Sequence, residues 1–447
     1  MIEYRSLRVA LLGAGSVGAQ VARLLLDHGD ELAQRVGAPL ELVGVAVRNP
    51  DAPRTADIPR HLLTTDAESL ILGADIVVEL MGGLEPARSH ILAAISSGAD
   101  VITANKALLA AHGNELFEAA DQVGAQLNYE AAVAGAIPII RPLRDSLAGD
   151  RVHRILGIVN GTTNYILDRM DTEHSSLEEA LARATELGYA EADPTADIEG
   201  YDAAQKAAIL ARLAFHTDVP VTLVHREGIT GITTAQVDQA RDSGYVIKLL
   251  AICERLTDAK TGEEGVSARV YPALVHRSHP LAAVHGANNA VFVEAEAAGD
   301  LMFYGAGAGG VETASAVLGD VVSAARRHVV GGPGLVTSAN SGLSVLPIGH
   351  VTTRYQVTLE VLDRPGVLAQ IAGVFADHGV SVETLVQTPP DADPLEETTG
   401  AARREPTATL VLGTHAAAES DLAATVTALH SHGFVGAVTS VLRVEGA

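Results

Sequence analysis

The sequence has one cysteine, a shortage of basic residues and no long apolar run. Cys253 alone cannot form an internal disulfide, and no cysteine-rich spacing suggests structural zinc, which fits a reducing cytoplasm. With 31 Lys and Arg against 55 Asp and Glu, the formal net charge is -24. This charge repels nucleic acid and anionic membranes, and no basic patch overrides it, so we expect neither partner.

The hydrophobic residues are spread along the chain, and no uninterrupted stretch is long enough to cross a bilayer. The N-terminus has no basic region followed by a cleavable apolar segment, because glycines interrupt its hydrophobic stretch. We therefore expect a cytoplasmic globular protein. A chain of 447 residues is long enough for about three domains.

Lysine is scarce: the chain has only Lys106, Lys206, Lys248 and Lys260. Arginine stays protonated, whereas a lysine can give up and regain a proton when its surroundings lower its pKa. A lysine inside a motif is therefore a candidate functional residue.

The first motif is a glycine triad. Residues 7–12 are apolar and predict a strand, and a helical pattern follows to about residue 27. Between them stand Gly13, Gly15 and Gly18, the spacing of a dinucleotide-binding turn, with Ser16 and Val17 at the start of the helix. We expect these five residues to contact a cofactor pyrophosphate; the alternative is a tight strand-to-helix turn without a ligand.

The second strand, "LELVGVAV", ends at Arg48, where a site for NAD usually carries an acidic residue. Arg48 suits the 2′-phosphate of NADP instead. NADP is therefore favoured, NAD is possible, and an ordinary solvated arginine is the alternative.

Further strands and helices alternate up to about residue 150, which predicts an α/β domain with a Rossmann-like doubly wound parallel sheet. Ligands bind such sheets beyond the carboxyl ends of the strands. Gly82, Asn105, Lys106 and Glu130 would lie there. A solvated lysine after a strand is the alternative for Lys106.

From about residue 151 the pattern changes, and we expect a second, α+β domain over 151–330. An apolar stretch leads into the polar cluster "NGTTN" at 160–164, which includes Thr162. Its hydroxyls and amides can hold a small polar ligand, or they can cap the helix that follows.

Lys206 lies in the segment 191–213, "EADPTADIEGYDAAQKAAILARL". Helical spacing puts it on the apolar face with Ile209 and Leu213, four residues after Asp202. A charged amine on that face needs a partner, and Asp202 is the obvious one. The pair either orients the helix only, or the lysine exchanges a proton with a carbonyl substrate.

In these motifs the sequence resembles the homoserine dehydrogenase family over about residues 8–330. The motifs occur in order: "GAGSVG" at 13–18, "TANK" at 103–106, "YEAAVAG" at 129–135, "NGTTNY" at 160–165, the segment 191–206 and "YGAGAGG" at 304–310. The resemblance implies NAD(P)H-dependent, reversible reduction of L-aspartate 4-semialdehyde to L-homoserine, a step toward threonine, methionine and isoleucine. The rivals are an enzyme acting on another amino-acid aldehyde or imine, and a non-catalytic amino-acid sensor.

The resemblance also implies roles for single residues. Lys206 is the proton donor, and Lys106 lies beside nicotinamide and substrate. Val311 and Glu312 depart from the family, because many relatives have a proline there. Further expected contacts are Glu191, Asp202, Asp197 and Thr162 with the substrate, Thr103 and Gly309 with the cofactor, and Glu130 with the carbonyls of Val133, Gly135 and Ile137 around a monovalent cation, for which the resemblance implies sodium.

After a linker at 331–350, residues 351–447 predict the order βαββαβ of a ferredoxin-like module, with a polar, mobile loop at 389–406. Its "DRPGVL" at 363–368 is similar to the ACT family, whose members bind amino acids. Threonine is the effector that the pathway suggests; a ligand-free dimerisation domain is the alternative. We expect a homo-oligomer, dimer or tetramer, in which a segment from about 305 returns to the first domain.

Overall fold

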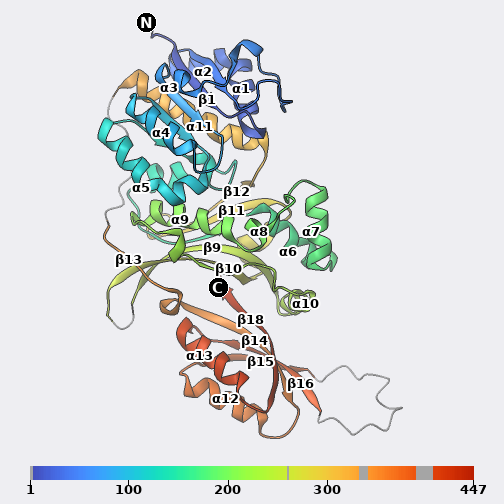
Figure 1. Cartoon of the computed structure of the whole chain (residues 1–447). Helices are drawn as coiled ribbons and strands as arrows, with labels where there is room; N and C mark the ends of the chain where they lie inside the picture. Colours follow the sequence, from blue (N-terminus) through green and yellow to red (C-terminus); the bar gives the residue numbers. More distant parts are fainter. Residues whose placement is uncertain (1–3, 259–260, 332–340, 389–405, 447) are drawn as a thin grey trace.

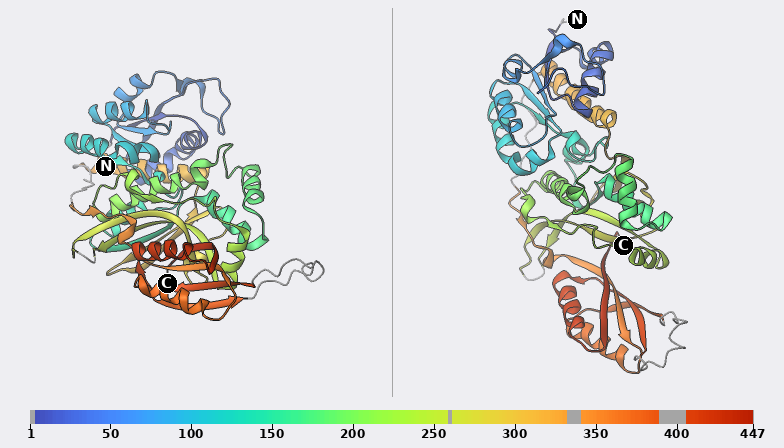
Figure 2. Two further views of the ribbon diagram at one scale, coloured as in Figure 1. Left: turned by 60° about the horizontal axis from the view of Figure 1, so that its bottom comes forward. Right: turned by 45° about the vertical axis from the view of Figure 1, so that its right-hand side comes forward.

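The computed structural model describes residues 4–258, 261–331, 341–388 and 406–446. Three bodies are stacked along one long axis, with the N-terminal domain at one end and the C-terminal domain at the other (Figure 1). The right-hand view in Figure 2 shows the same elongated arrangement. None of the helices in these ranges is long and apolar enough to cross a membrane.

The N-terminal domain is a parallel sheet of order β3-β2-β1-β4-β5-β6 with helices packed around it. Its central strands are buried on both faces, which is why they are almost continuously apolar. The predicted Rossmann-like fold is confirmed. The strands are β1 (Leu7–Leu12), β2 (Leu40–Ala46), β3 (Leu63–Thr64), β4 (Ile76–Glu79), β5 (Asp100–Thr103) and β6 (Leu127–Asn128). The helices are α1 (Ser16–Asp27), α2 (Gly29–Val36), α3 (Ala67–Leu72), α4 (Ala87–Ser96) and α5 (Lys106–Val123).

The middle domain places helices on a mostly antiparallel sheet of order β12-β11-β7-β9-β10. Helix α9 lies between this sheet and α5, and its many alanines allow close packing on both sides. The strands are β7 (Val152–Ile158), β8 (His225–Arg226), β9 (Tyr245–Thr257), β10 (Glu264–His276), β11 (Asn288–Ala295) and β12 (Gly299–Ala306). The helices are α6 (Gly161–Glu173), α7 (Leu177–Glu186), α8 (Thr195–Ile198), α9 (Tyr201–Phe215) and α10 (Thr234–Asp242).

After β12 the chain returns to the N-terminal domain as α11 (Gly310–Val330), which packs against α1 and α2. The C-terminal domain then forms a sheet of order β18-β14-β16-β15 with two helices, the ferredoxin-like ACT fold that the sequence predicts. Its elements are β14 (Thr352–Leu362), α12 (Val367–Asp377), β15 (Val382–Thr388), β16 (Thr407–Thr414), β17 (Ala417–Ala418), α13 (Glu419–His430) and β18 (Val435–Glu445). The loop predicted at 389–406 lies, except for its last residue, outside the described residues.

The middle and C-terminal domains share one sheet, which the sequence did not predict. Strand β18 pairs in parallel with β10, so that Ala273 lies opposite Arg443 and Val275 opposite Glu445. The described part of the predicted linker contributes β13 (Ser344–Val345), which also pairs with β10. The two domains are therefore joined by backbone hydrogen bonds as well as by the chain.

Candidate active site

The glycine triad forms a turn that leaves room for a ligand at one position. Gly13 has φ +100°, and a Cβ there would lie 2.6 Å from the carbonyl oxygen of Leu80. A Cβ on Gly18 would overlap the carbonyl oxygen of Gly13. A Cβ on Gly15 would meet no atom within 4 Å. Two glycines are thus required by the packing of the protein, and the third keeps open the space that a pyrophosphate needs.

A second helix begins beside the first. Gly309, with φ +140°, is the N-cap of α11, and a Cβ on Gly310 would lie 3.0 Å from the carbonyl oxygen of Ser16. The N-termini of α1 and α11 therefore face the same space, where their dipoles favour an anion. The expected departure from the family at Val311 and Glu312 leaves the start of α11 at Gly310. The carboxylate of Glu312 lies against Gly309 and adds negative charge to this anion-favouring space.

A cleft of about 960 Å³ continues from the glycine turn past the end of β2. Arg48 and Arg54 both line it. Arg54 donates to the carbonyls of Asn49, Pro50 and Ala52 and so holds the loop. Arg48 is exposed and has no hydrogen bond or ion pair with any described residue, so its guanidinium is available to a ligand.

The turn after β5 positions Lys106. The buried hydroxyl of Thr103 donates to Glu79 at 2.7 Å and accepts from the backbone N–H of Asn105 at 3.0 Å. Asn105 caps α5, of which Lys106 is the first residue. Because the Thr103 hydroxyl already bonds to Glu79 and Asn105, the predicted contact with the cofactor would have to be made by the backbone of Thr103.

Lys206 points inward and pairs with Asp202, as helical spacing predicted. Its side chain is 11% exposed, and its ammonium donates to Asp202 Oδ2 at 2.7 Å and to the carbonyl of Val159 at 2.6 Å. An ammonium has three donors. The third has no partner among the described residues and is free for a substrate oxygen.

Asp202 joins both lysines. Its Oδ1 lies 3.0 Å from Nζ of Lys106, and its Oδ2 accepts from Lys206 and, at 2.9 Å, from the side-chain amide of Asn160. Burial alone would raise the pKa of Asp202, but the two lysines hold that pKa well below its usual range. Asp202 is therefore a carboxylate at every working pH, fixed between a buried amine and the half-exposed Lys106.

Asn160 caps α6 and also binds two carboxylates, so the capping role expected for the "NGTTN" cluster is confirmed, whereas binding of a small polar ligand there stays a prediction. Its Oδ1 accepts from the backbone N–H of Thr163 at 2.8 Å, and its amide donates to Asp197 at 2.7 Å as well as to Asp202. Burial, and then repulsion by Asp202, raise the pKa of Asp197. Asn160 and the carbonyl of Val159 are site groups that periodicity did not single out.

Of two further predicted substrate contacts, Glu191 stays outside this cluster, and Thr162 lies at its edge, where its side chain contacts Asp197. Glu191 is exposed and has no hydrogen bond or ion pair with a described residue. Thr162 donates its hydroxyl to the carbonyl of Tyr189 at 2.7 Å and so ties α6 to the loop that carries Glu191. Both substrate contacts stay predictions.

The carboxylate of Glu130 does not fit the cation ligand that the sequence predicted. It accepts the backbone N–H groups of Ile139, Ile140 and Arg141 at 2.6, 2.7 and 3.0 Å, and Nε of Arg141 at 2.8 Å. Four donors fill its lone pairs. Only backbone carbonyls remain as possible ligands, and no group of three acidic, histidine or cysteine side chains suited to a metal occurs among the described residues.

Those carbonyls lie beside a polar side chain that lacks partners. Gly135 has φ +61°, and a Cβ there would overlap the carbonyl of Gly307. On the other side of Gly307 stands the amide of Asn289, fully buried and without a hydrogen-bond partner among the described residues. Carbonyl and amide oxygens are ligands that a hard cation prefers, so this loop fits a monovalent cation.

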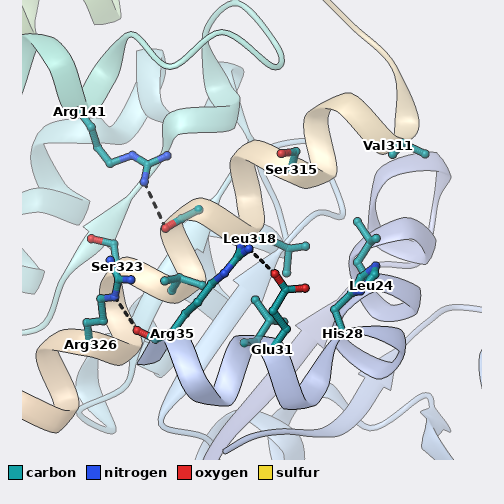
Figure 3. Close-up of a pocket in the computed structure, with 13 residues that line it drawn as sticks. Leu24, His28, Glu31, Arg35, Arg141, Val311, Ser315, Leu318, Ser323 and Arg326 are labelled. Atoms are coloured by element: carbon teal, nitrogen blue, oxygen red, sulfur yellow. Dashed lines mark hydrogen bonds and ion pairs between the residues drawn. The ribbon is translucent and has the colours of Figure 1, made fainter. Parts of the chain in front are cut away.

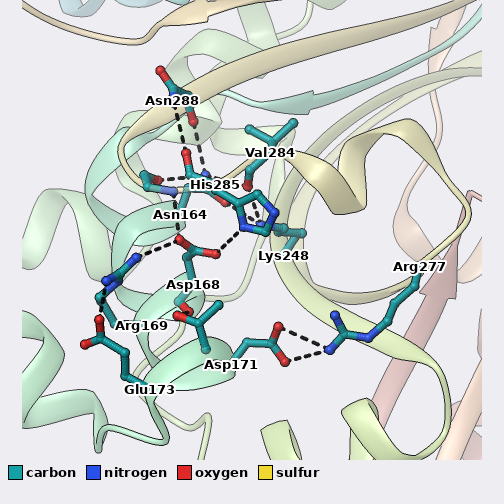
Figure 4. A network of polar contacts seen from close by, with 12 residues as sticks. Asn164, Asp168, Arg169, Asp171, Glu173, Lys248, Arg277, Val284, His285 and Asn288 are labelled. Carbon is teal, nitrogen blue, oxygen red and sulfur yellow. Dashed lines mark hydrogen bonds and ion pairs between the residues drawn. The ribbon is translucent and has the colours of Figure 1, made fainter.

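A third lysine, Lys248 on β9, belongs to a separate buried network (Figure 4). Its ammonium donates to Asn164 at 3.0 Å and to the carbonyl of Val284 at 2.7 Å. One turn further along α6, Asp168 binds His285 and the backbone N–H of Gly286. This network fixes α6, and the N-cap residue of α6 is Asn160 of the candidate site. Burial lowers the pKa of Lys248 from 10.5 to about 8.

This shift predicts how stability depends on pH. Below pH 8 Lys248 is charged in both the folded and the unfolded protein, and burial of that charge lowers the free energy of unfolding. As pH rises from 8 toward 10.5, the unfolded pKa, the folded protein gives up the proton first and this penalty is lost. The unfolding free energy of the unmodified protein should therefore rise relative to that of Lys248→Met by up to about 3 kcal/mol across this window. Chemical denaturation of both proteins at several pH values measures it. A difference that does not change with pH would contradict the burial argument.

A groove of about 820 Å³ between α1, α2 and α11 contains none of the predicted site residues (Figure 3). Leu24, Leu32 and Leu318 line it. Its arginines are engaged within the protein: Arg35 pairs with Glu31, and Arg326 donates to the carbonyl of Arg35 at 3.0 Å. The lysine pair, between the first two domains, therefore stays the candidate site for the chemistry.

Comparisons with known proteins point to one family. Family models match residues 13–130 (homoserine dehydrogenase, NAD binding domain), 138–322 (homoserine dehydrogenase) and 355–434 (ACT domain). A homoserine dehydrogenase of Corynebacterium glutamicum is 53% identical over 98% of this chain and 95% of its own. The crystal structure of a homoserine dehydrogenase from Thiobacillus denitrificans has a TM-score of 0.87 and 36% identity, covering 99% of both chains. A hyperthermophilic archaeal homoserine dehydrogenase in complex with NADPH has a TM-score of 0.60 and 25% identity, covering 73% of this chain and 99% of its own.

Proposed function

Because this chain belongs to the homoserine dehydrogenase family, an NAD(P)-dependent oxidoreductase family, we propose that Lys206 is the proton donor when L-aspartate 4-semialdehyde is reduced to L-homoserine. The observation that carries the proposal is a buried ammonium with one donor left over. Its other two donors bind Asp202 and the carbonyl of Val159. The remaining N–H is directed to the substrate oxygen.

The bound nicotinamide supplies the hydride to the aldehyde carbon or accepts it back from homoserine. As negative charge develops on the aldehyde oxygen, Lys206 stabilises it and transfers a proton, so that the oxygen becomes the hydroxyl of homoserine. Lys206 is then neutral and regains its proton from solvent. Asp202 stays ionised and orients both lysines, while Glu191 and Asp197 offer carboxylates to the α-ammonium of the substrate. Thr162 supports this site through the loop it holds.

Substrate specificity tests this assignment. The purified chain should oxidise L-homoserine with NADP and should leave L-serine and L-threonine almost unchanged, because their hydroxyls lie one carbon closer to the α-carbon than that of homoserine. Appearance of NADPH by absorbance measures the rate. Equal rates with all three amino acids would contradict the assignment.

The proposed cofactor is NADP, with NAD as a weaker substitute, supported by the unpaired Arg48 in the cleft and by the NADPH-bound archaeal relative. We expect Arg48→Met to raise KM for NADPH by about 10-fold, the equivalent of one lost charge-assisted hydrogen bond or ion pair, and to leave KM for NADH unchanged. Steady-state kinetics with both cofactors measure this. If both KM values change equally, Arg48 does not recognise the 2′-phosphate.

A monovalent cation, sodium by the family resemblance, is proposed to bind the carbonyls of Glu130, Val133, Gly135 and Ile137. The partnerless amide of Asn289 beside this loop supports the proposal. We further propose a cytoplasmic homo-oligomer. The open edge strand β15, on which Leu385 and Val386 are 40% and 59% exposed, supports contact between copies of the chain.

Threonine is the proposed effector of the C-terminal domain. A cavity of about 310 Å³ lies over the turn "DRPGVL", between the end of β14 and the start of α12. Gly366 there has φ +93°, and the next backbone N–H groups of α12 after Val367, those of Leu368 and Ala369, have no partner among the described residues. Asp363 accepts from Gln387 at 3.2 Å. A carboxylate and open amides suit the two charged groups of an amino acid.

Threonine is therefore expected to inhibit the intact chain. Asp363→Asn should raise the threonine concentration needed for half-inhibition by about 10-fold, because one charge-assisted contact to the ammonium is lost, and should leave uninhibited turnover unchanged. A point substitution tests the effector site more specifically than truncation does, because removal of β18 would also expose the edge of β10. Insensitivity of both proteins to threonine would leave the domain as a dimerisation module.

A further inference from the structure

The loop between α8 and α9, taken with the helix ends beside it as the loop 198–202, ends at Asp202 and is held from outside the active site by the segment 225–229. The guanidinium of Arg226 stacks on the ring of Tyr201 at 3.6 Å and donates to the carbonyl of Glu199. The N–H of Ile229 donates to the carbonyl of Ile198 at 2.7 Å. A Cβ on Gly228 would overlap this carbonyl, so the two segments are in close backbone contact.

The same segment is held in turn by the C-terminal domain. Arg443 on β18 donates to Glu227 at 2.9 Å and to Glu419 on α13 at 2.6 Å, and its side chain is 12% exposed. Glu227 also binds His225, at 2.7 Å. Burial alone would raise the pKa of Glu227, but the contacts with His225 and Arg443 hold it at about 2. The carboxylate therefore stays charged and keeps hold of Arg443.

Lys206 is held from outside this segment as well as from within it. Its ammonium is held by Asp202 and by the carbonyl of Val159, which lies on the other side of the site. Loosening the loop 198–202 would therefore displace the acidic residues around the substrate more than it would displace the proton donor. The expected consequence is weaker substrate binding with little change in the chemical step.

We propose that Arg443, Glu227 and Arg226 form a relay of positioning residues through which the C-terminal domain sets the affinity of the active site for homoserine. The relay crosses the domain boundary at the contact of Arg443 with Glu227, and it reaches the active-site segment through the contact of Arg226 with Tyr201. This proposal rests on the proposed function, because the loop that the relay positions leads into Asp202. The domain thus acts on substrate binding even without an effector.

The test compares Glu227→Gln, Arg443→Met and their combination with the unmodified chain. Each single change is expected to raise KM for homoserine about 10-fold, with kcat within about 2-fold and the dissociation constant of NADPH unchanged. The double change should raise KM no further, because both substitutions break the same contact. Arg443→Lys, which keeps the charge beside Glu227, should recover most of the affinity.

Arg354→Met is the matched control, since Arg354 pairs with Glu383 at 3.4 Å inside the C-terminal domain. Its KM should equal that of the unmodified chain. If Arg443→Met does not fold, Arg226→Lys carries the same prediction, because it keeps the charge and loses the flat stack on Tyr201. A KM unchanged in both folded Glu227→Gln and Arg226→Lys would overturn the relay. Failure of the unmodified chain to oxidise homoserine would instead overturn the proposed function.

Discussion

Replacement of Lys206 by methionine is expected to lower kcat for semialdehyde reduction by about 10²- to 10⁴-fold, the usual contribution of a positioned proton donor. Methionine fills a similar volume without a proton to give. Asp202 keeps its ion pair with Lys106 at 3.0 Å, so the change does not leave a buried carboxylate without a counter-charge. The melting temperature and NADPH binding should change little, which separates lost chemistry from lost structure.

Lys206→Arg distinguishes a proton donor from a structural cation. Arginine preserves a positive charge beside Asp202 but does not release its proton at working pH. We therefore expect Lys206→Arg to fold and to remain nearly as slow as Lys206→Met. Turnover close to that of the unmodified enzyme would mean that the position needs only a charge, which was the alternative left open by the periodicity of α9.

Asp202→Asn is expected to lower kcat/KM by about 100-fold, because an amide cannot orient two ammonium groups and charge-assisted contacts to both are lost together. The matched variant is Asp197→Asn. Asp197 shares the Asn160 amide with Asp202 but forms no ion pair with a lysine among the described residues. Its replacement should therefore cost about 10-fold or less.

Steady-state kinetics of the two variants measure the difference. Equal losses would show that the acidic cluster acts only through its total charge. A loss confined to KM in Asp202→Asn would assign this residue to substrate binding alone, against its proposed role in orienting Lys206.

Much of the site follows from local patterns in the sequence. The spacing of apolar residues in α9 was enough to predict that Lys206 points inward and pairs with Asp202, because helix geometry fixes which residues share a face. The glycine triad was recognisable because backbone crowding at Gly13 and Gly18 excludes any side chain. In each case the cause lies within a few residues of the effect.

The features of the site that were not predicted from the sequence depend on residues far apart in the chain. The carboxylate of Glu130 accepts hydrogen bonds from backbone N–H groups nine to eleven positions later. This turn geometry leaves no periodic pattern in the sequence. The hydroxyl of Thr103 is taken by Glu79, on the neighbouring strand. The pairing of β10 with β18 depends on a register between strands about 170 residues apart, and it creates the contact between Arg443 and Glu227.

The most direct test of Lys206 as proton donor is the primary isotope effect on kcat with NADPH deuterated at the transferred position. In Lys206→Met the loss of the donor should slow the chemical step until it limits turnover. The isotope effect should therefore be larger in the variant than in the unmodified enzyme, alongside a much lower kcat. A low kcat with an unchanged isotope effect would mean that fewer molecules are active, and an unchanged kcat would mean that the proton comes from elsewhere.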